Sequence, residues 1–178
     1  MWEPFPAACT THNYQLFVQA CRIVDIFSPN HIEATALFEE TPSSDYEREN
    51  LEKYAFEIAR NVAVDTGSQG TVVIRAGAHG SLTTLGPADY VWFPAFYEET
   101  SPKVLDPTGA GNAFLGGFIA GWLASRDVHE ASMYGNVAAS FAIEQIGLPT
   151  LKTVGEREFW NGDVPWERLN TYKKRVGG

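Results

Sequence analysis

Apolar residues recur at regular spacing along most of the chain, and the spacing changes from one segment to the next. Between Leu51 and Val62 the apolar side chains fall three or four residues apart, which places them on one face of a helix. By this criterion helices are predicted at 14–24, 31–40, 51–62, 130–147 and 166–174, and another runs from the glycine-rich stretch at 109 to about 125. Strands are predicted at 25–27 and 89–93, and 71–85 is interpreted as a strand, a glycine turn and a second strand.

Strands and helices alternate through most of the chain, which predicts an α/β layered fold with a largely parallel sheet. The polar segment 41–50 is expected to be a loop. The tail after Leu151 is expected to be irregular, apart from the helix at 166–174. We see no internal repeat and no linker, so residues 1–178 are interpreted as one domain or part of one.

Composition and charge narrow the choice of partners. The formal net charge is −9 and the pI is about 4.8, which argues against non-specific binding to nucleic acid or to an anionic membrane. The longest apolar run, Phe114–Ala124, is too short to span a bilayer, and the first residues lack a basic leader, so we expect a cytoplasmic protein. Cys9 and Cys21 fit no metal spacing and are expected to be reduced thiols.

The most informative stretch is VLDPTGAGNAFLGGF, which runs from Val104 to Phe118. Three consecutive small residues at its centre stand at the start of an apolar helix, where unpaired N–H groups and the helix dipole favour an anion. Phosphate is the expected guest, and a helix start used only for packing is the alternative. A Walker loop would need a Gly-Lys-Ser/Thr sequence, and a dinucleotide fingerprint would need a glycine at Phe114. Gly116, Gly117 and Gly121 are expected to let the helix pack tightly against a sheet.

This stretch resembles the C-terminal signature of the PfkB, or ribokinase-like, carbohydrate kinases, whose loop reads Asp-Thr-Gly-Ala-Gly-Asp. Three further stretches resemble motifs of the family and occur in the family's order: SPNHIEA at 28–34, VVIRAGAHGSL at 72–82 and GNVAASFAIEQIG at 135–147. The resemblance implies a ribokinase-like three-layer α/β/α fold and ATP-dependent phosphoryl transfer to a hydroxyl of a sugar or related alcohol. The proline in DPTGAGN and the opening WEPFPAAC are most similar to a fungal branch of the family related to killer-maintenance proteins.

The resemblance assigns the loop its roles. Gly109, Ala110 and Gly111 would form the anion hole for the transferring phosphate. Asn112 occupies the position at which the family has a catalytic aspartate that accepts the proton of the substrate hydroxyl. Asparagine can hydrogen-bond that hydroxyl but cannot act as the base. Turnover is therefore expected to be impaired, and a non-catalytic nucleotide-binding scaffold or regulatory pseudo-kinase is the alternative function.

Four further positions would hold cations, and each has a simpler structural role as the alternative. Asn30 and Glu33 match the family's Asn-x-x-Glu pair, which would order Mg²⁺ through water; the alternative is capping of the helix that follows. Asp106 and Thr108 match positions that help to hold a monovalent cation, such as K⁺, near the loop. Their alternative role is capping of the strand end.

The nucleotide would be lined by Gly77, Gly80 and Asn136. The two glycines can equally form a plain hairpin turn. Arg75 stands where the family usually has threonine, and it would either contact phosphate or reach solvent from a strand end.

The matches all belong to the C-terminal, nucleotide-binding part of the family, whose members are considerably longer than this chain. The part that normally supplies the lid and most sugar contacts has no counterpart here. We therefore expect the chain to need a partner chain or a further N-terminal half, because an open sheet exposes an edge and an apolar face.

Other enzyme classes fit the sequence less well. Asp65–Ser68 reads Asp-Thr-Gly-Ser, the aspartic-protease signature, but that chemistry needs two carboxylates and the chain has one copy of the signature. We interpret this segment as a helix end and a turn. The four histidines match no zinc spacing, and a Gly-x-Ser-x-Gly elbow is absent from the sequence.

Overall fold

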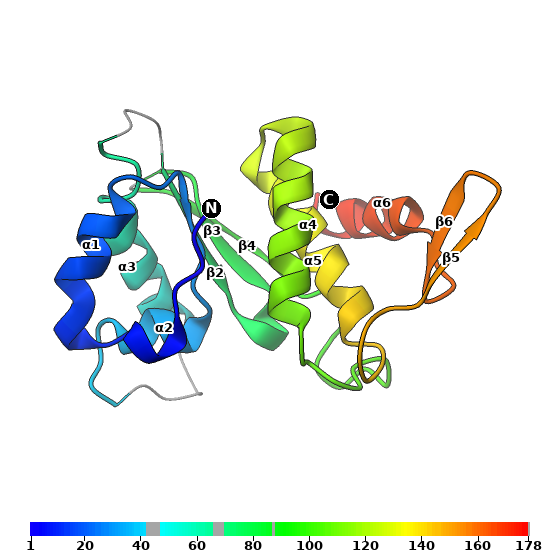
Figure 1. Ribbon diagram of the computed structural model, residues 1–178, viewed down its shortest axis with the longest axis horizontal. Helices are drawn as coiled ribbons and strands as arrows, with labels where there is room; N and C mark the ends of the chain where they lie inside the picture. Colours follow the sequence, from blue (N-terminus) through cyan, green and yellow to red (C-terminus); the bar gives the residue numbers. More distant parts are fainter. Residues whose placement is uncertain (42–46, 66–69, 87, 178) are drawn as a thin grey trace. The chain divides into compact units, whose positions relative to one another are not determined.

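The computed structural model describes residues 1–41, 47–65, 70–86 and 88–177. These form two compact units, which are described separately (Figure 1). The first unit comprises Met1–Gly77 and Ser81–Trp92, and the second comprises Ala78–Gly80 and Phe93–Gly178. Among the described helices, none combines the length and the apolar character needed to cross a membrane.

The first unit combines helices with a sheet. Its helices are η1 (Pro6–Ala8), η2 (Thr11–Asn13), α1 (Tyr14–Cys21), α2 (His31–Ala36) and α3 (Arg48–Ala59). Its strands are β1 (Ile26–Phe27), β2 (Thr71–Arg75), β3 (Ser81–Thr84) and β4 (Tyr90–Phe93), which continues by one residue into the second unit. The short helix η3 (Gly77–His79) joins β2 to β3.

The sheet has the order β1-β2-β3-β4 and is mixed. β1 pairs parallel to β2, with Ile26 opposite Thr71, and β2 pairs antiparallel to β3, with Ile74 opposite Leu82. The α/β class is confirmed, whereas the expectation of largely parallel pairing holds in this sheet for β1 and β2 and not for β2 and β3. The reason is the short connection after Arg75, because so few residues can join only antiparallel neighbours.

The core of the first unit lies between this sheet and its helices. Leu51 of α3, Val72 and Ile74 of β2, and Leu82 of β3 are fully buried in one apolar cluster. All five residues of β2 are buried, which fits a central strand rich in Val and Ile. The ends of this core strand therefore present fixed positions for polar side chains such as Arg75.

The second unit is mainly helical. It contains α4 (Ala110–Ser125), α5 (Val128–Ala142), β5 (Leu151–Val154), β6 (Arg157–Trp160) and α6 (Pro165–Val176). Figure 1 shows α4 and α5 side by side as a helical hairpin. Arg126 takes a left-handed conformation at the end of α4, and the Asp127 side chain accepts hydrogen bonds from the first amides of α5. This turn and cap explain the sharp reversal between the two helices.

Several predicted boundaries shift, and one pair of strands was missed. The first helix ends at Cys21, three residues before the predicted end, and α5 ends at Ala142, before Gly147. The tail predicted to be irregular contains the antiparallel hairpin of β5 and β6, with Val154 opposite Arg157. The two-residue turn between them begins with Gly155 at φ 63°, which is a recognisable hairpin signal.

Candidate functional site

The glycine loop is held at its entry by the end of α5. The backbone N–H groups of Leu105 and Asp106 both donate to the Ile143 carbonyl, at 2.8 and 3.2 Å. The Asp106 carboxylate then accepts a hydrogen bond of 2.9 Å from the Thr108 N–H. These contacts fix the direction in which the chain enters the turn before α4.

Gly109 and the first residues of α4 decide which N–H groups remain available. Gly109 has φ 83°, a left-handed conformation that strains any residue with a Cβ. The N–H of Ala110 donates to the Pro107 carbonyl at 3.1 Å. By contrast, the N–H groups of Gly109, Gly111 and Asn112 donate to no acceptor within the part of the chain that the structure describes.

This pattern changes which residues are candidates for holding an anion. Ala110, one of the three positions expected to form the hole, uses its N–H within the turn. Asn112 supplies a donor that was not predicted from the sequence, namely its own backbone N–H at the third position of the helix. The signal was available in the sequence, because the first N–H groups of any helix lack internal acceptors.

The Asp106 carboxylate is a stable anion beside the loop. Hydrogen bonds from the side chain and the backbone N–H of Thr108 lower the pKa of Asp106 below its usual value. The Thr108 N–H and the Asp106 carboxylate thus contact each other within the turn. The strand-end cap that was the alternative to cation binding is not formed, because no described strand ends at Asp106.

Close packing of α4 on α5 sets the position of the loop. A Cβ on Gly117 would lie 2.5 Å from the Ala138 Cβ and 2.6 Å from the Tyr134 carbonyl oxygen, and one on Gly121 would lie 2.9 Å from Tyr134. These glycines therefore allow contact with a helix, where we expected contact with a sheet. Gly116 differs, because a Cβ there would have no neighbour within 4 Å among the described residues.

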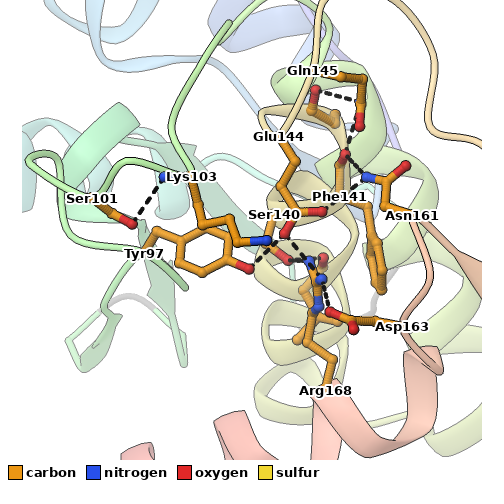
Figure 2. A network of polar contacts seen from close by, with 12 residues as sticks. Tyr97, Ser101, Lys103, Ser140, Phe141, Glu144, Gln145, Asn161, Asp163 and Arg168 are labelled. Atoms are coloured by element: carbon orange, nitrogen blue, oxygen red, sulfur yellow. Dashed lines mark hydrogen bonds and ion pairs between the residues drawn. The ribbon is translucent and has the colours of Figure 1, made fainter.

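A buried ionic network holds the end of α5 to α6 (Figure 2). Arg168 of α6 pairs with Glu144 at 3.0 Å, and both side chains are almost fully buried. Glu144 also accepts hydrogen bonds from the Tyr97 hydroxyl at 2.6 Å and from the Asn161 amide at 2.9 Å. Glu144 follows Ile143, whose carbonyl holds the loop entry, so the network fixes the segment on which the loop depends.

The same network raises the pKa of the Tyr97 hydroxyl. Burial and the hydrogen bond to Glu144 raise the pKa of Tyr97 to about 12. Tyr97 therefore stays protonated at neutral pH and donates its hydroxyl hydrogen to the carboxylate.

The remaining nucleotide candidates lie at turns or in a helix interface. Gly77 and Gly80 have φ values of 56° and 88°, as a tight turn requires, and a Cβ on Gly80 would lie 2.0 Å from the Phe93 carbonyl oxygen. Asn136 is buried in α5, where its amide donates to the Ser132 carbonyl at 3.0 Å. The turn that we gave as the alternative for the glycines is present, and Gly77 belongs to the first unit whereas Gly80 and Asn136 belong to the second.

Asn30, Glu33 and Arg75 come together in the first unit. The Asn30 side chain caps α2 and Glu33 returns a hydrogen bond to the Asn30 N–H, which completes a capping box. Arg75 neither reaches solvent nor stands alone, because its guanidinium contacts Glu33 and Glu3.

A groove of about 470 Å³ lies beside the first two turns of α4 in the second unit. Its lining is mostly apolar and includes Ala113, Phe141, Trp160 and Trp166. The size suits a small molecule or a few side chains of another segment.

The alternative chemistries gain no support from the described residues. Asp65 of the protease-like signature forms an exposed ion pair with Arg22, and the other three positions of the signature lie outside the described residues. Cys9 and Cys21 are free cysteines, and both are buried. Within the described ranges there is no group of three or more His, Cys, Asp or Glu side chains placed to hold a metal ion.

Comparisons with known proteins support the resemblance to the carbohydrate kinases that the sequence motifs indicated. The model of the pfkB family of carbohydrate kinases matches residues 8–153. Protein MAK32 of Saccharomyces cerevisiae, a fungal relative as the sequence led us to expect, is 33% identical over 99% of this chain and 49% of its own length. The chain spans about half the length of the curated relatives that it matches over nearly all of its residues.

Solved structures show the fold. The match to Arabidopsis thaliana ribokinase complexed with ribose and ATP spans 74% of this chain and 38% of the ribokinase chain, with 20% identity and a TM-score of 0.58. The match to adenosine kinase from Anopheles gambiae in complex with P1,P4-di(adenosine-5) tetraphosphate spans 79% of this chain and 40% of the adenosine kinase chain. The two chains are 28% identical and the TM-score is 0.60. The fold is therefore ribokinase-like.

Proposed function

Since the chain belongs to the pfkB family of carbohydrate kinases, we propose that it binds the phosphates of ATP at the glycine loop. The single observation that carries this proposal is the set of N–H groups on Gly109, Gly111 and Asn112, which have no acceptor among the described residues. They stand at the N-terminal end of a 16-residue helix, whose dipole adds to the attraction for an anion.

The proposed reaction is phosphoryl transfer from ATP to a hydroxyl of a sugar or related alcohol. Such transfer depends mainly on positioning and on charge stabilisation, which the backbone of the loop supplies. Asn112 lacks the basicity to accept the hydroxyl proton, and loss of a general base typically costs ~10²–10⁴-fold in rate. We therefore propose slow transfer or none, with nucleotide binding retained.

A non-catalytic role is the second candidate, and Asn112 is the observation that favours it. In this role the chain binds nucleotide as a scaffold or regulatory pseudo-kinase. The apolar groove beside α4 supports the related proposal that the chain works with a partner chain or with a further part of the protein, because a groove of this size lined by two tryptophans exposes much apolar surface.

The cations implied by the family fit the described residues unequally. Asp106 and Thr108 lie at the loop, and an aspartate carboxylate is a suitable oxygen ligand for K⁺, which would add positive charge near the phosphates. Asn30 and Glu33 fit Mg²⁺ poorly, because the Asn30 side-chain oxygen and Glu33 Oε2 are already engaged in the capping box. No step of the proposed reaction is assigned to Mg²⁺ at that pair.

Two measurements test the proposal. Calorimetric titration of the chain with ATP should show binding, whereas adenosine, which lacks phosphate, should bind much more weakly. In ATP-binding protein that is supplied with an N-terminal, sugar-binding half of the family, Asn112→Asp should raise sugar-dependent ADP release by ~10²–10⁴-fold. Folded protein that gives no heat with ATP would contradict nucleotide binding, and an Asn112→Asp variant with unchanged ADP release would favour the non-catalytic role.

A further inference from the structure

Arg75 lies between two carboxylates in the first unit. Its Nη1 is 2.7 Å from Glu3 Oε1, and its Nη2 is 3.4 Å from Glu33 Oε2. Nη2 also donates to the Ser28 carbonyl at 3.2 Å. The Arg75 side chain is 10% exposed, so these contacts form in a partly dehydrated setting where charges interact strongly.

The N-terminal segment brings the second carboxylate to Arg75. Trp2 forms a parallel bridge with Phe27 of β1, and its backbone exchanges hydrogen bonds with Ile26 and Ser28. This short extension of the sheet holds Glu3, the next residue, at the guanidinium. Arg75 is therefore fixed by backbone pairing on one side and by α2 on the other.

Glu33 depends on the charge of Arg75. Its side chain is 4% exposed, and burial raises the pKa of Glu33, whereas the Asn30 N–H and the Arg75 guanidinium oppose that rise. A buried carboxylate without a positive partner is costly, so the guanidinium compensates a charge that is otherwise exposed to little water.

A hydrated divalent cation fits poorly beside Asn30 and Glu33. Mg²⁺ keeps several of its waters and needs carboxylate oxygens that those waters can reach. Glu33 Oε2 already accepts from the Asn30 N–H at 2.7 Å and contacts Arg75, and the Asn30 oxygen accepts from the Glu33 N–H at 2.8 Å. A second cation at this position would also be repelled by the guanidinium at short range.

We propose that Arg75 takes the place of a divalent cation at Asn30 and Glu33, so that this chain binds no metal ion at the pair. The part of the proposal that concerns nucleotide rests on the proposed function: ATP binds with an affinity that does not depend on a metal held by Glu33. The part that concerns the metal stands on the contacts of Arg75 alone and can be tested without nucleotide.

The test uses Mn²⁺ alone as a paramagnetic probe of the 178-residue chain. In the natural chain, Mn²⁺ should leave the backbone amide signals of Asn30 and Glu33 unbroadened. In Arg75→Thr, which removes the guanidinium, the same titration should broaden them, provided that the dispersion of the amide spectrum shows a folded protein. Broadening in the natural chain, or its absence in folded Arg75→Thr, overturns the proposal.

A second measurement uses ATP in Mg²⁺ buffer, where any Mg²⁺ carried by ATP itself is common to both proteins compared. The dissociation constants of the natural chain and of Glu33→Gln, whose glutamine can still close the capping box, should agree. A loss of affinity of about tenfold or more in folded Glu33→Gln contradicts the proposal. If ATP fails to bind to either protein, the proposed function fails, while the Mn²⁺ titration still decides the role of Arg75.

Discussion

Gly116 and Gly117 are neighbours in α4 with opposite surroundings, and alanine at each position should have opposite effects on stability. Alanine in place of an exposed helical glycine gains about 0.8–1 kcal/mol. At Gly116 nothing within 4 Å opposes that gain, so Gly116→Ala should stabilise the second unit by about 0.5–1 kcal/mol.

At Gly117 the same gain is outweighed by a clash. The new Cβ would lie 2.5 Å from the Ala138 Cβ and 2.6 Å from the Tyr134 carbonyl oxygen, so α4 and α5 must move apart. Overpacking of this kind typically costs about 1–3 kcal/mol, and a backbone carbonyl cannot rotate away as a flexible side chain can. With the helix gain deducted, Gly117→Ala should destabilise the second unit by up to about 2 kcal/mol.

The assay is urea unfolding followed by the amide signals of the second unit. Its free energy of unfolding should differ between the two variants by about 0.5–3 kcal/mol, with Gly116→Ala the more stable. Equal stabilities for Gly116→Ala and Gly117→Ala would refute the inferred close packing of α4 on α5.

Three further predictions follow from burial and charge. Arg168→Met leaves a buried carboxylate without its partner and should cost about 3–5 kcal/mol in urea unfolding; a loss below about 1 kcal/mol contradicts the network. Burial raises the pKa of Cys9 and of Cys21 to about 12, so Ellman's reagent should react with unfolded protein and hardly at all with native protein; rapid native reaction contradicts this. The pKa of Asp106 is lowered in the folded chain by its hydrogen bonds from Thr108. The stability that these hydrogen bonds contribute is therefore present above the ordinary Asp pKa and is lost as the pH falls through the lowered pKa. The Thr108 amide shift should therefore stay constant from about pH 5 to 8, and a change near neutral pH contradicts the assignment.

The sequence predicted local features well where a single chemical rule decides them. Capping of the next helix by Asn30 was the alternative to a metal site, and the structure shows the full capping box with Glu33. The helix after Gly109 was also predicted, with an end at about 125 where the structure has Ser125. These features depend on nearest neighbours in the chain.

Features that depend on distant contacts were not predictable in the same way. The partners of Arg75 include Glu3, which is far away in sequence and arrives through the bridge of Trp2 with Phe27. The contact of Gly117 with α5 depends on how two helices pack. The glycines therefore indicated that α4 packs closely on another element, but the sequence did not show that this element is α5. The β5–β6 hairpin was missed although Gly155 gave a local signal, because the exposed strands lack apolar alternation.

The most direct test of phosphate binding at the loop is an amide NMR titration of the chain with ATP, with adenosine as the control. ATP should shift the backbone amide signals of Gly109, Gly111 and Asn112, the donors left without described acceptors, and adenosine should leave them in place. If saturating ATP leaves these three signals unchanged while it shifts others, the phosphates bind elsewhere and the central claim is wrong.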